Sequence, residues 1–302
     1  MPAQGLAGEL LAAYDDARLL TLPSGRAGGL TVPEAYEVGD QLRLARLARG
    51  ERARGYKIGF TNRTFWPRYN VFEPIWAPVW ERTLRLLEGT EATTSLQGLV
   101  QPRLEPEIVF GFRAAPRAGM NEAELTGCLA WVAHGYEIVH THFDGWRFTA
   151  ADTVADFALH GRLLVGPRVP VDAFKRLGEE LAALELTLSC DGRELETGHG
   201  RNVLGGPLNA LRLWVDAMAQ RTPAWPIGAG DVVTTGTLTD AWPMAPGQVW
   251  QSRPGDARLP GLPDRHPLSA VAGCITMRGS ASTRRDQERW QSGRMRRTRN
   301  PV

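Results

Sequence analysis

The stretch LVQPRLEPEIVFGF (residues 99–112) places two acids, Glu105 and Glu107, inside an otherwise apolar run. Its β-branched and aromatic residues favour a strand, and side chains two positions apart on a strand point to the same face. Glu105 and Glu107 are therefore predicted to project together, whereas Ile108 and Phe110 face the other side. The chemistry of the chain is predicted around this shared acidic face.

Two interpretations of these paired acids are open. Pro106 cannot donate to a strand ladder, which predicts an edge or a bulge, and on an edge both acids are merely hydrated. Neighbouring carboxylates repel, however, and a hard divalent cation turns that repulsion into binding. A third acid, Glu137, follows among the strand-forming residues of HGYEIVHTHF. If the two strands pair, three carboxylates converge, which is a ligand set that Mg²⁺ accepts. His140 and His142 are interpreted as packing or surface residues rather than as ligands of a softer metal.

Helical patterns precede Gly55, and strand signals dominate after it. Apolar residues at helical spacing predict the helices 6–20, about 32–50, 121–134 and 207–221. In the second helix, Thr31 and Glu34 have the spacing of a capping box. The segment LELTLSCDGRELETG alternates around Asp191-Gly192, which predicts a hairpin with a type I′ turn. The chain is therefore predicted to be α+β, with an N-terminal helical segment (1–52) and a catalytic β-rich domain (53–262).

Composition and charge argue against a membrane protein, a secreted protein and a nucleic-acid-binding protein. The 302 residues are 43% hydrophobic but contain no apolar run long enough to span a membrane, and the N-terminus lacks the pattern of a signal peptide. The three cysteines have no metal-type spacing, so reduced thiols in a cytoplasmic protein are expected. Residues 263–302 have no apolar period and many arginines, which predicts a disordered basic tail. The remaining body is acidic, so no nucleic-acid partner is expected.

Two further stretches carry residues with possible chemistry. Lys57 in GYKIGF is one of only two lysines in an arginine-rich chain, and its ammonium responds to burial as a guanidinium does not. Asp156 in AADTVADFALHG is interpreted either as part of a site or as a surface acid. The glycines of GHGRNVLGGP (198–207) do not fit a nucleotide-binding loop, so no nucleotide site is expected.

The order of these segments resembles a known family. GYKIGF, QPRLEPEIVF, GYEIVH, DTVADF, GRNVLGGPLNAL and GDVVTTGTLTDA follow one another as in the 2-keto-4-pentenoate hydratase / oxalocrotonate decarboxylase family, a branch of the fumarylacetoacetate hydrolase superfamily. The resemblance covers roughly residues 30–262. It implies a mixed β-sandwich roll, like the C-terminal domain of fumarylacetoacetate hydrolase, with an N-terminal helical part and assembly as a homo-oligomer.

The resemblance also implies roles for particular residues. It implies a Mg²⁺ (or Mn²⁺) site at Glu105, Glu107 and Glu137. Lys57 is the implied active-site lysine and Asp156 its polar catalytic neighbour. The implied wall near the carboxylate of the substrate is formed by Thr235, Gly236 and Thr237.

The implied activity is that of a metal-dependent lyase that adds water to a 2-hydroxy-2,4-dienoate in aromatic-compound degradation, acting on a small 2-keto acid. Decarboxylation of a vinylogous 2-oxo diacid and C–C hydrolysis of an acylpyruvate use the same enolate and stay open. So does a catalytically silent binding subunit, since Phe157 and Leu159 stand where many hydratases have asparagine and serine. NVFEPIWAPVW (70–80) likewise lacks an aspartate that several hydratases carry.

Overall fold

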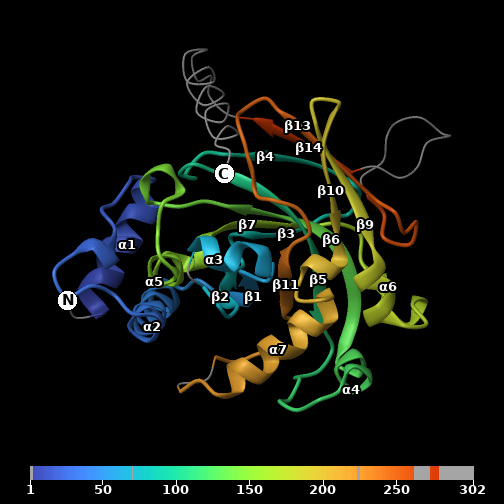
Figure 1. Ribbon diagram of the computed structural model, residues 1–302, viewed down its shortest axis with the longest axis horizontal. Helices are drawn as coiled ribbons and strands as arrows, with labels where there is room; N and C mark the ends of the chain where they lie inside the picture. Colours follow the sequence, from blue (N-terminus) through green and yellow to red (C-terminus); the bar gives the residue numbers. More distant parts are fainter. Residues whose placement is uncertain (1–2, 70, 223–224, 262–272, 279–302) are drawn as a thin grey trace, which may run out of the picture.

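Two mixed β-sheets form the centre of the protein in the computed structural model, which describes residues 3–69, 71–222, 225–261 and 273–278 (Figure 1). Within these residues, one sheet has nine strands and the other has five. The larger sheet follows the order β2-β1-β11-β5-β6-β7-β3, with β12 added beside β5 and β8 beside β6. The smaller sheet follows the order β10-β9-β13-β14-β4. Pairing is antiparallel except for β1 with β11, β3 with β7, and β4 with β14.

The strands of the larger sheet are β1 (Ala53–Gly59), β2 (Ile75–Trp80), β3 (Leu84–Leu86), β5 (Arg103–Phe112), β6 (Leu129–Val139), β7 (His160–Val165), β8 (Val169–Pro170), β11 (Val232–Thr237) and β12 (Trp242–Pro243). Those of the smaller sheet are β4 (Glu91–Ser95), β9 (Glu185–Cys190), β10 (Arg193–His199), β13 (Val249–Pro254) and β14 (Gly273–Arg278). The helices are α1 (Ala3–Asp16), α2 (Val32–Ala48), α3 (Trp66–Tyr69), α4 (Glu122–Gly127), α5 (Ala150–Ala155), α6 (Leu177–Ala183) and α7 (Pro207–Ala219).

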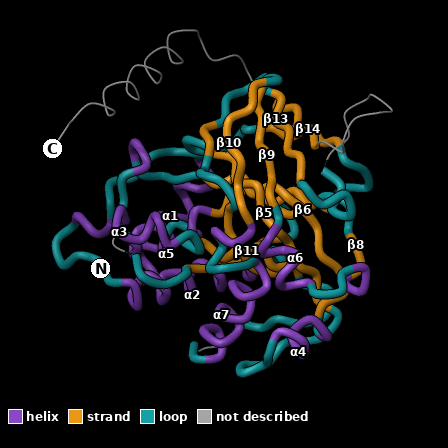
Figure 2. Tube along the Cα trace, turned by 45° about the vertical axis from the view of Figure 1, so that its right-hand side comes forward, coloured by secondary structure: helices purple, strands orange, loops and turns teal. Residues whose placement is uncertain are grey.

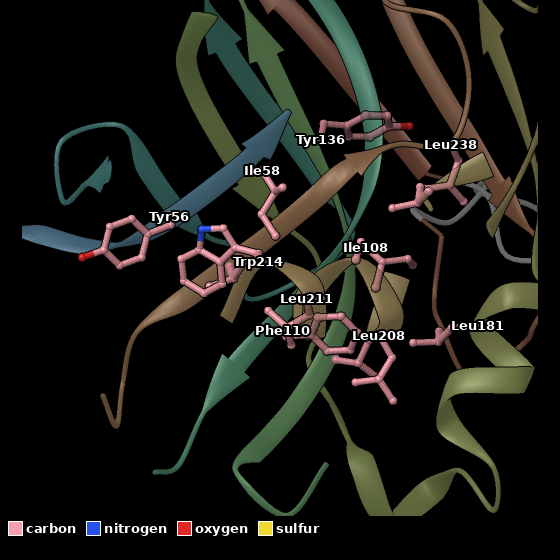
Figure 3. Packing of buried hydrophobic residues seen from close by; sticks show 14 of the residues in the cluster. Tyr56, Ile58, Ile108, Phe110, Tyr136, Leu181, Leu208, Leu211, Trp214 and Leu238 are labelled. Carbon is pink, nitrogen blue, oxygen red and sulfur yellow. The ribbon is translucent and has the colours of Figure 1, made fainter. Parts of the chain in front are cut away.

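Helix α7 covers one face of the larger sheet. Its buried residues Leu208, Leu211 and Trp214 recur at helical spacing and lie against the sheet, as Figure 3 shows. The rings of Trp214 and Tyr56 have centroids 5.2 Å apart. Ile108 belongs to the same buried cluster, so the even-numbered residues of β5 face this core. The odd-numbered acids of β5 are therefore left for the opposite face.

Helices α1, α2 and α5 gather at one side of the sheets (Figures 1 and 2). The capping box predicted for α2 is present, because the Thr31 side chain accepts from the Glu34 N–H and the Glu34 carboxylate accepts from the Thr31 N–H. Buried residues of α1 and α2, such as Leu10 and Leu42, share one cluster with Phe157. This packing brings the N-terminal helices against the turn that follows α5.

The predicted hairpin and α7 are confirmed, whereas the helix predicted at 121–134 is wrong beyond its first turns. Strands β9 and β10 flank Asp191 and Gly192, both with positive φ as a type I′ turn requires. Helix α4 ends at Gly127, and β6 begins at Leu129. Pairing with β5 along its whole length decides this segment, because its alanines, valines and aromatic residues fit either element locally.

The tail also differs from its prediction in one part. Residues 273–278 form β14, which pairs with β13 and β4, although the predicted disordered tail (263–302) includes them. The adjacent β-branched residues of GCITMR suit a strand, and the partners of this strand lie far away in the sequence. The rest of that predicted tail lies outside the described residues. Among the described residues, no helix combines the length and the apolar character needed to cross a membrane.

Candidate active site

Three carboxylates meet on the face of the larger sheet that α7 does not cover. Glu105 on β5 lies directly opposite Glu137 on β6, and Glu107 follows two positions later on the same face. One carboxylate oxygen from each residue lies within 4.8 Å of the others. Glu107 and Glu137 are fully buried, and Glu105 is partly exposed. Three oxygens at this spacing can hold a metal ion.

Pro106 lies in the interior of the sheet, so the predicted edge is wrong, and the predicted bulge is not found at Pro106 itself, which pairs in register with Tyr136. The irregularity lies in the neighbouring strand: β11 shifts register against β5 between Thr234 and Thr237. Strand β12 then takes over the pairing at Leu104. Proline is tolerated in β5 because the ladder is already interrupted beside it.

Glu107 has one satisfied and one unsatisfied oxygen. Its Oε2 accepts hydrogen bonds from the Thr234 hydroxyl and from the Gly236 N–H at 2.8 Å. Its Oε1 is buried and has no hydrogen-bond partner among the described residues. Burial raises the pKa of Glu107 well above its ordinary value, and the charges of Glu137 and Glu105 raise it further. A buried oxygen without a partner, close to two other carboxylates, fits a cation ligand.

Gly236 requires its glycine for two reasons. Its φ is +101°, and an added Cβ would lie 1.9 Å from Oγ1 of Thr61. This backbone geometry is what directs the Gly236 N–H at Glu107.

Glu137 is held by a histidine and a lysine. Its Oε1 lies 2.7 Å from Nδ1 of His160, and its Oε2 lies 3.1 Å from Nζ of Lys57. Burial alone would raise the pKa of Glu137, but the Lys57 charge and the His160 hydrogen bond outweigh it and lower that pKa. Burial lowers the pKa of His160 despite its contact with Glu137. Glu137 is therefore an ionised carboxylate beside a neutral imidazole.

Lys57 is buried beside the three acids. Burial would lower the pKa of its ammonium, but the carboxylates of Glu137, Glu105 and Glu107 together raise it. Its Nζ also donates to the carbonyl oxygen of Ala158 at 2.9 Å. Lys57 is consequently a fixed cation rather than a base.

The Ala158 carbonyl belongs to an unusual turn. Phe157, Ala158 and Leu159 all have positive φ, between 47° and 66°, a conformation that costs about 1–2 kcal/mol per residue outside glycine. Asp156 lies at the start of this turn, and its Oδ1 is 2.5 Å from Nδ1 of His142. Its Oδ2 accepts from the backbone N–H of His142 at 3.0 Å. The Asp156 side chain thus anchors the turn through His142.

The predicted substrate wall is only partly directed at the site. Gly236 and Thr237 line a cavity that also contains Lys57 and Glu105. The Thr235 hydroxyl instead donates to the backbone oxygen of Ile108 at 2.9 Å. Its neighbour Thr234, which the sequence did not single out, contacts Glu107.

The cavity is lined by charged, polar and apolar side chains. Its charged and polar lining residues are Lys57, Thr61, Asn62, Arg103, Glu105, Thr237 and Asp240. Its apolar wall is formed by Phe60, Ile75, Val139, Trp146, Phe148 and Leu159. The Arg103 guanidinium lies over the Trp146 ring, 4.0 Å from its centroid. Burial raises the pKa of Glu105 to about 7, with Lys57 opposing the rise and Glu137 and Asp240 adding to it. The cavity can receive a small anionic molecule that carries an apolar part.

Arg103, His160 and Thr83 were not predicted as site residues; the Thr83 hydroxyl contacts Nε2 of His160. Arg103 lies two positions before Glu105, so the strand alternation that paired the two acids was also the signal for Arg103. No local pattern marks His160 or Thr83, because their contacts depend on how distant strands pair.

Known proteins resemble this chain over most of its length, although comparison with protein-family models gives no match. It is 30% identical over 241 residues to 2-hydroxyhexa-2,4-dienoate hydratase from Comamonas testosteroni, which covers 79% of this chain and 88% of that protein. It is 30% identical over 218 residues to a 4-oxalocrotonate decarboxylase from a Pseudomonas species, covering 72% and 81%. The 2-keto-4-pentenoate hydratase of Paraburkholderia phymatum is 33% identical over 205 residues, covering 68% and 75%.

Solved structures share the fold at lower identity. The 4-oxalocrotonate decarboxylase from Pseudomonas putida G7, complexed with magnesium and adipate, has a TM-score of 0.78 at 20% identity and covers 91% of this chain and 97% of its own. The fumarylpyruvate hydrolase from Pseudomonas aeruginosa, in complex with Mn²⁺ and pyruvate, has a TM-score of 0.55 at 11% identity and covers 75% and 90%. These similarities confirm the predicted fold.

Proposed function

Because this chain belongs to the family of 2-keto-4-pentenoate hydratases and 4-oxalocrotonate decarboxylases, we propose that it adds water to a 2-hydroxy-2,4-dienoate. It acts in aromatic-compound degradation with a divalent cation held by Glu105, Glu107 and Glu137. The observation that carries the proposal is the meeting of three carboxylate oxygens within 4.8 Å. The buried, unpaired Oε1 of Glu107 supports it independently.

The donor set favours Mg²⁺ or Mn²⁺. All three candidate ligands are carboxylate oxygens, which hard cations prefer, and three protein ligands leave positions for water and substrate. When bound, such a dication supplies Lewis-acid stabilisation of the negative charge that develops on the 2-oxygen of the substrate.

Residues of the chain supply a positive charge, a proton donor and groups that orient the substrate. Lys57 holds a positive charge beside the acids and can donate a proton as the dienol becomes the keto acid, since its raised pKa keeps it an ammonium. The carbonyl of Ala158 fixes the position of that ammonium. Gly236 and Thr237 form part of the wall that orients the substrate. We assign Asp156 a positioning role, because its carboxylate holds the 156–159 turn through His142.

Removing the metal provides the main test of this function. Dialysis against a chelator should abolish the loss of ultraviolet absorbance of a 2-hydroxy-2,4-dienoate, and Mg²⁺ or Mn²⁺ should restore it. The Mg²⁺ concentration for half-maximal restoration should fall as pH rises, because Glu105, with a pKa of about 7, must lose its proton to bind the ion. From pH 6 to pH 8 the proton of Glu105 alone predicts a decrease of about 10-fold, and the raised pKa of Glu107 makes the dependence steeper.

The outcomes separate the rival activities. Undiminished turnover without metal would contradict the metal role. Metal binding without turnover of any dienoate, oxo diacid or acylpyruvate would favour a silent binding subunit. Turnover of an acylpyruvate in preference to the dienoate would favour C–C hydrolysis.

Decarboxylation of a 2-oxo diacid is the second candidate function, and Arg103 is the observation that favours it. Arg103 lines the cavity on the same face of β5 as Glu105, and its guanidinium lies over the Trp146 ring. A planar guanidinium is suited to a second carboxylate at the far end of a substrate.

We therefore expect Arg103→Met to separate the two substrate classes. Methionine can keep an apolar contact with Trp146 but cannot bind a carboxylate. If the diacid is the natural substrate, kcat/KM for it should fall about 10- to 100-fold more than kcat/KM for a monoacid dienoate. Both rates can be followed by absorbance, with Arg117→Met as a control at an exposed arginine. An equal effect on both substrates would remove the argument for decarboxylation.

A further inference from the structure

A buried threonine–histidine pair lies behind Glu137. His160 begins β7 and is 2% exposed, and Thr83, in the turn between β2 and β3, is 9% exposed. Both ring nitrogens of His160 are engaged: Nδ1 lies 2.7 Å from Oε1 of Glu137, and Nε2 lies 2.8 Å from Oγ1 of Thr83. Neither residue lines the cavity formed by the described residues, so neither can touch the substrate there.

The hydrogen-bond inventory assigns the protons of this pair. An ionised Glu137 can only accept, so Nδ1 of His160 must carry a hydrogen. In a neutral ring Nε2 is then bare and accepts from the Thr83 hydroxyl. The Thr83 hydroxyl also lies 3.0 Å from the Trp80 carbonyl oxygen and can donate to it, but that oxygen already accepts from the Thr83 N–H at 2.9 Å. We place the single hydroxyl hydrogen on the shorter contact, the 2.8 Å one to the bare Nε2, which has no other donor. The Trp80 N–H in turn donates to Thr83 Oγ1 at 3.1 Å. One tautomer satisfies every group.

The fixed tautomer has a consequence for Glu137. Its Oε1 is committed to His160, so only Oε2, the oxygen beside Lys57, is left to reach an ion. Rotation of the carboxylate would break the contact with His160 and bury an unpaired N–H. A ligand that is already oriented loses less conformational freedom when the ion binds.

We propose that Thr83 and His160 are positioning residues that fix the orientation of Glu137 and thereby strengthen binding of the divalent cation. This inference rests on the proposed function, because it takes Glu137 as a ligand. The device consists of a hydroxyl that selects the histidine tautomer and a ring N–H that holds one carboxylate oxygen.

Thr83→Val tests this device from a distance. Valine has the shape of threonine but cannot donate to Nε2, so the tautomer with Nδ1–H facing Glu137 loses one of the two contacts that favour it. We expect the dissociation constant for Mn²⁺, measured without substrate by electron paramagnetic resonance, to rise about 10-fold or more. Thr83→Ser retains the hydroxyl and should restore affinity to within about threefold. At low metal concentration the valine variant should turn over more slowly than the wild type. At saturating metal its kcat should return close to the wild-type value.

A matched control separates this effect from simple loss of a buried hydroxyl. Thr153 is a second buried threonine, and its hydroxyl donates to the backbone oxygen of Ala150 at 2.7 Å. Thr153→Val should change stability without changing Mn²⁺ affinity. Equal Mn²⁺ affinity in Thr83→Val and in the wild type overturns the inference but leaves the proposed function intact. A wild-type protein that binds no Mn²⁺ overturns both.

A second pair of variants keeps the test decisive if Thr83→Val does not fold. His160→Asn keeps an N–H donor near the position of Nδ1, whereas His160→Leu keeps none. We expect the leucine variant to bind Mn²⁺ at least about 10-fold more weakly than the asparagine variant. Equal affinities would show that the donor to Glu137 does not matter.

Discussion

Glu107→Gln should abolish binding of the divalent cation and reduce kcat/KM at least about 100-fold. The expectation follows from the two donors that meet at Oε2, the Thr234 hydroxyl and the Gly236 N–H. Only the amide oxygen of glutamine can accept from them, so the amide NH₂ must take the place of Oε1. A donor then points at the position where the other two acids converge, and it cannot bind a cation.

The same substitution should leave the protein folded. Glu107 is buried and its pKa is well above the ordinary value, so its ionised form opposes folding in the absence of metal. Because the folded state of such an acid binds its proton more tightly than the unfolded chain, the acid contributes less stability as pH rises from its ordinary pKa toward its raised one. Glutamine removes this dependence, and the metal-free variant should unfold at the same temperature as the wild type or higher at pH 8.

Isothermal titration calorimetry with Mg²⁺ checks the loss of cation binding in Glu107→Gln. Thermal unfolding followed by circular dichroism checks that this variant stays folded. Glu194→Gln is a suitable control, because Glu194 is an exposed acid on β10. If Glu107→Gln binds Mg²⁺ as tightly as the wild type, Glu107 is not a ligand.

The alternation of side chains along a β-strand explains why the acidic face of β5 could be predicted from the sequence. The shared face of Glu105 and Glu107 depends only on the period of a β-strand, and the structure contains it. Glu137 could be added because its segment also has strand-forming residues. Its register against Glu105 was not available from the sequence, since register depends on the pairing of two whole strands.

The predictions that differ from the structure depend on longer-range packing. The segment from Leu129 suits a helix or a strand, and its ten-position ladder with β5 decides in favour of the strand. Thr235 shares a face with Thr237 in a regular strand, but the register shift in β11 brings Thr234 to Glu107 instead. Thr83 and His160 are 77 positions apart, so no local pattern could connect them.

The role of Lys57 should be visible both in catalysis and in stability. Lys57→Met removes the only lysine that the structure places beside the acids, and kcat should fall about 100- to 1,000-fold, as for the loss of one preorganised donor. It also leaves the ionised Glu137 without its ion-pair partner in a buried position. Breaking a buried pair in this way costs about 3–5 kcal/mol of stability in the metal-free protein.

Added Mg²⁺ should offset that loss of stability but not the loss of turnover, and this difference is the discriminating result. A dication can replace the charge of Lys57 beside Glu137 and stabilises the folded state by mass action, whereas it cannot donate a proton. Thermal unfolding with and without Mg²⁺, beside single-turnover rates at saturating Mg²⁺, measures both effects. Lys175→Met is the matched control, because Lys175 is exposed and is the other lysine of the chain. Wild-type turnover in Lys57→Met would mean that the raised pKa of this lysine serves the fold alone, and that the site needs another proton donor.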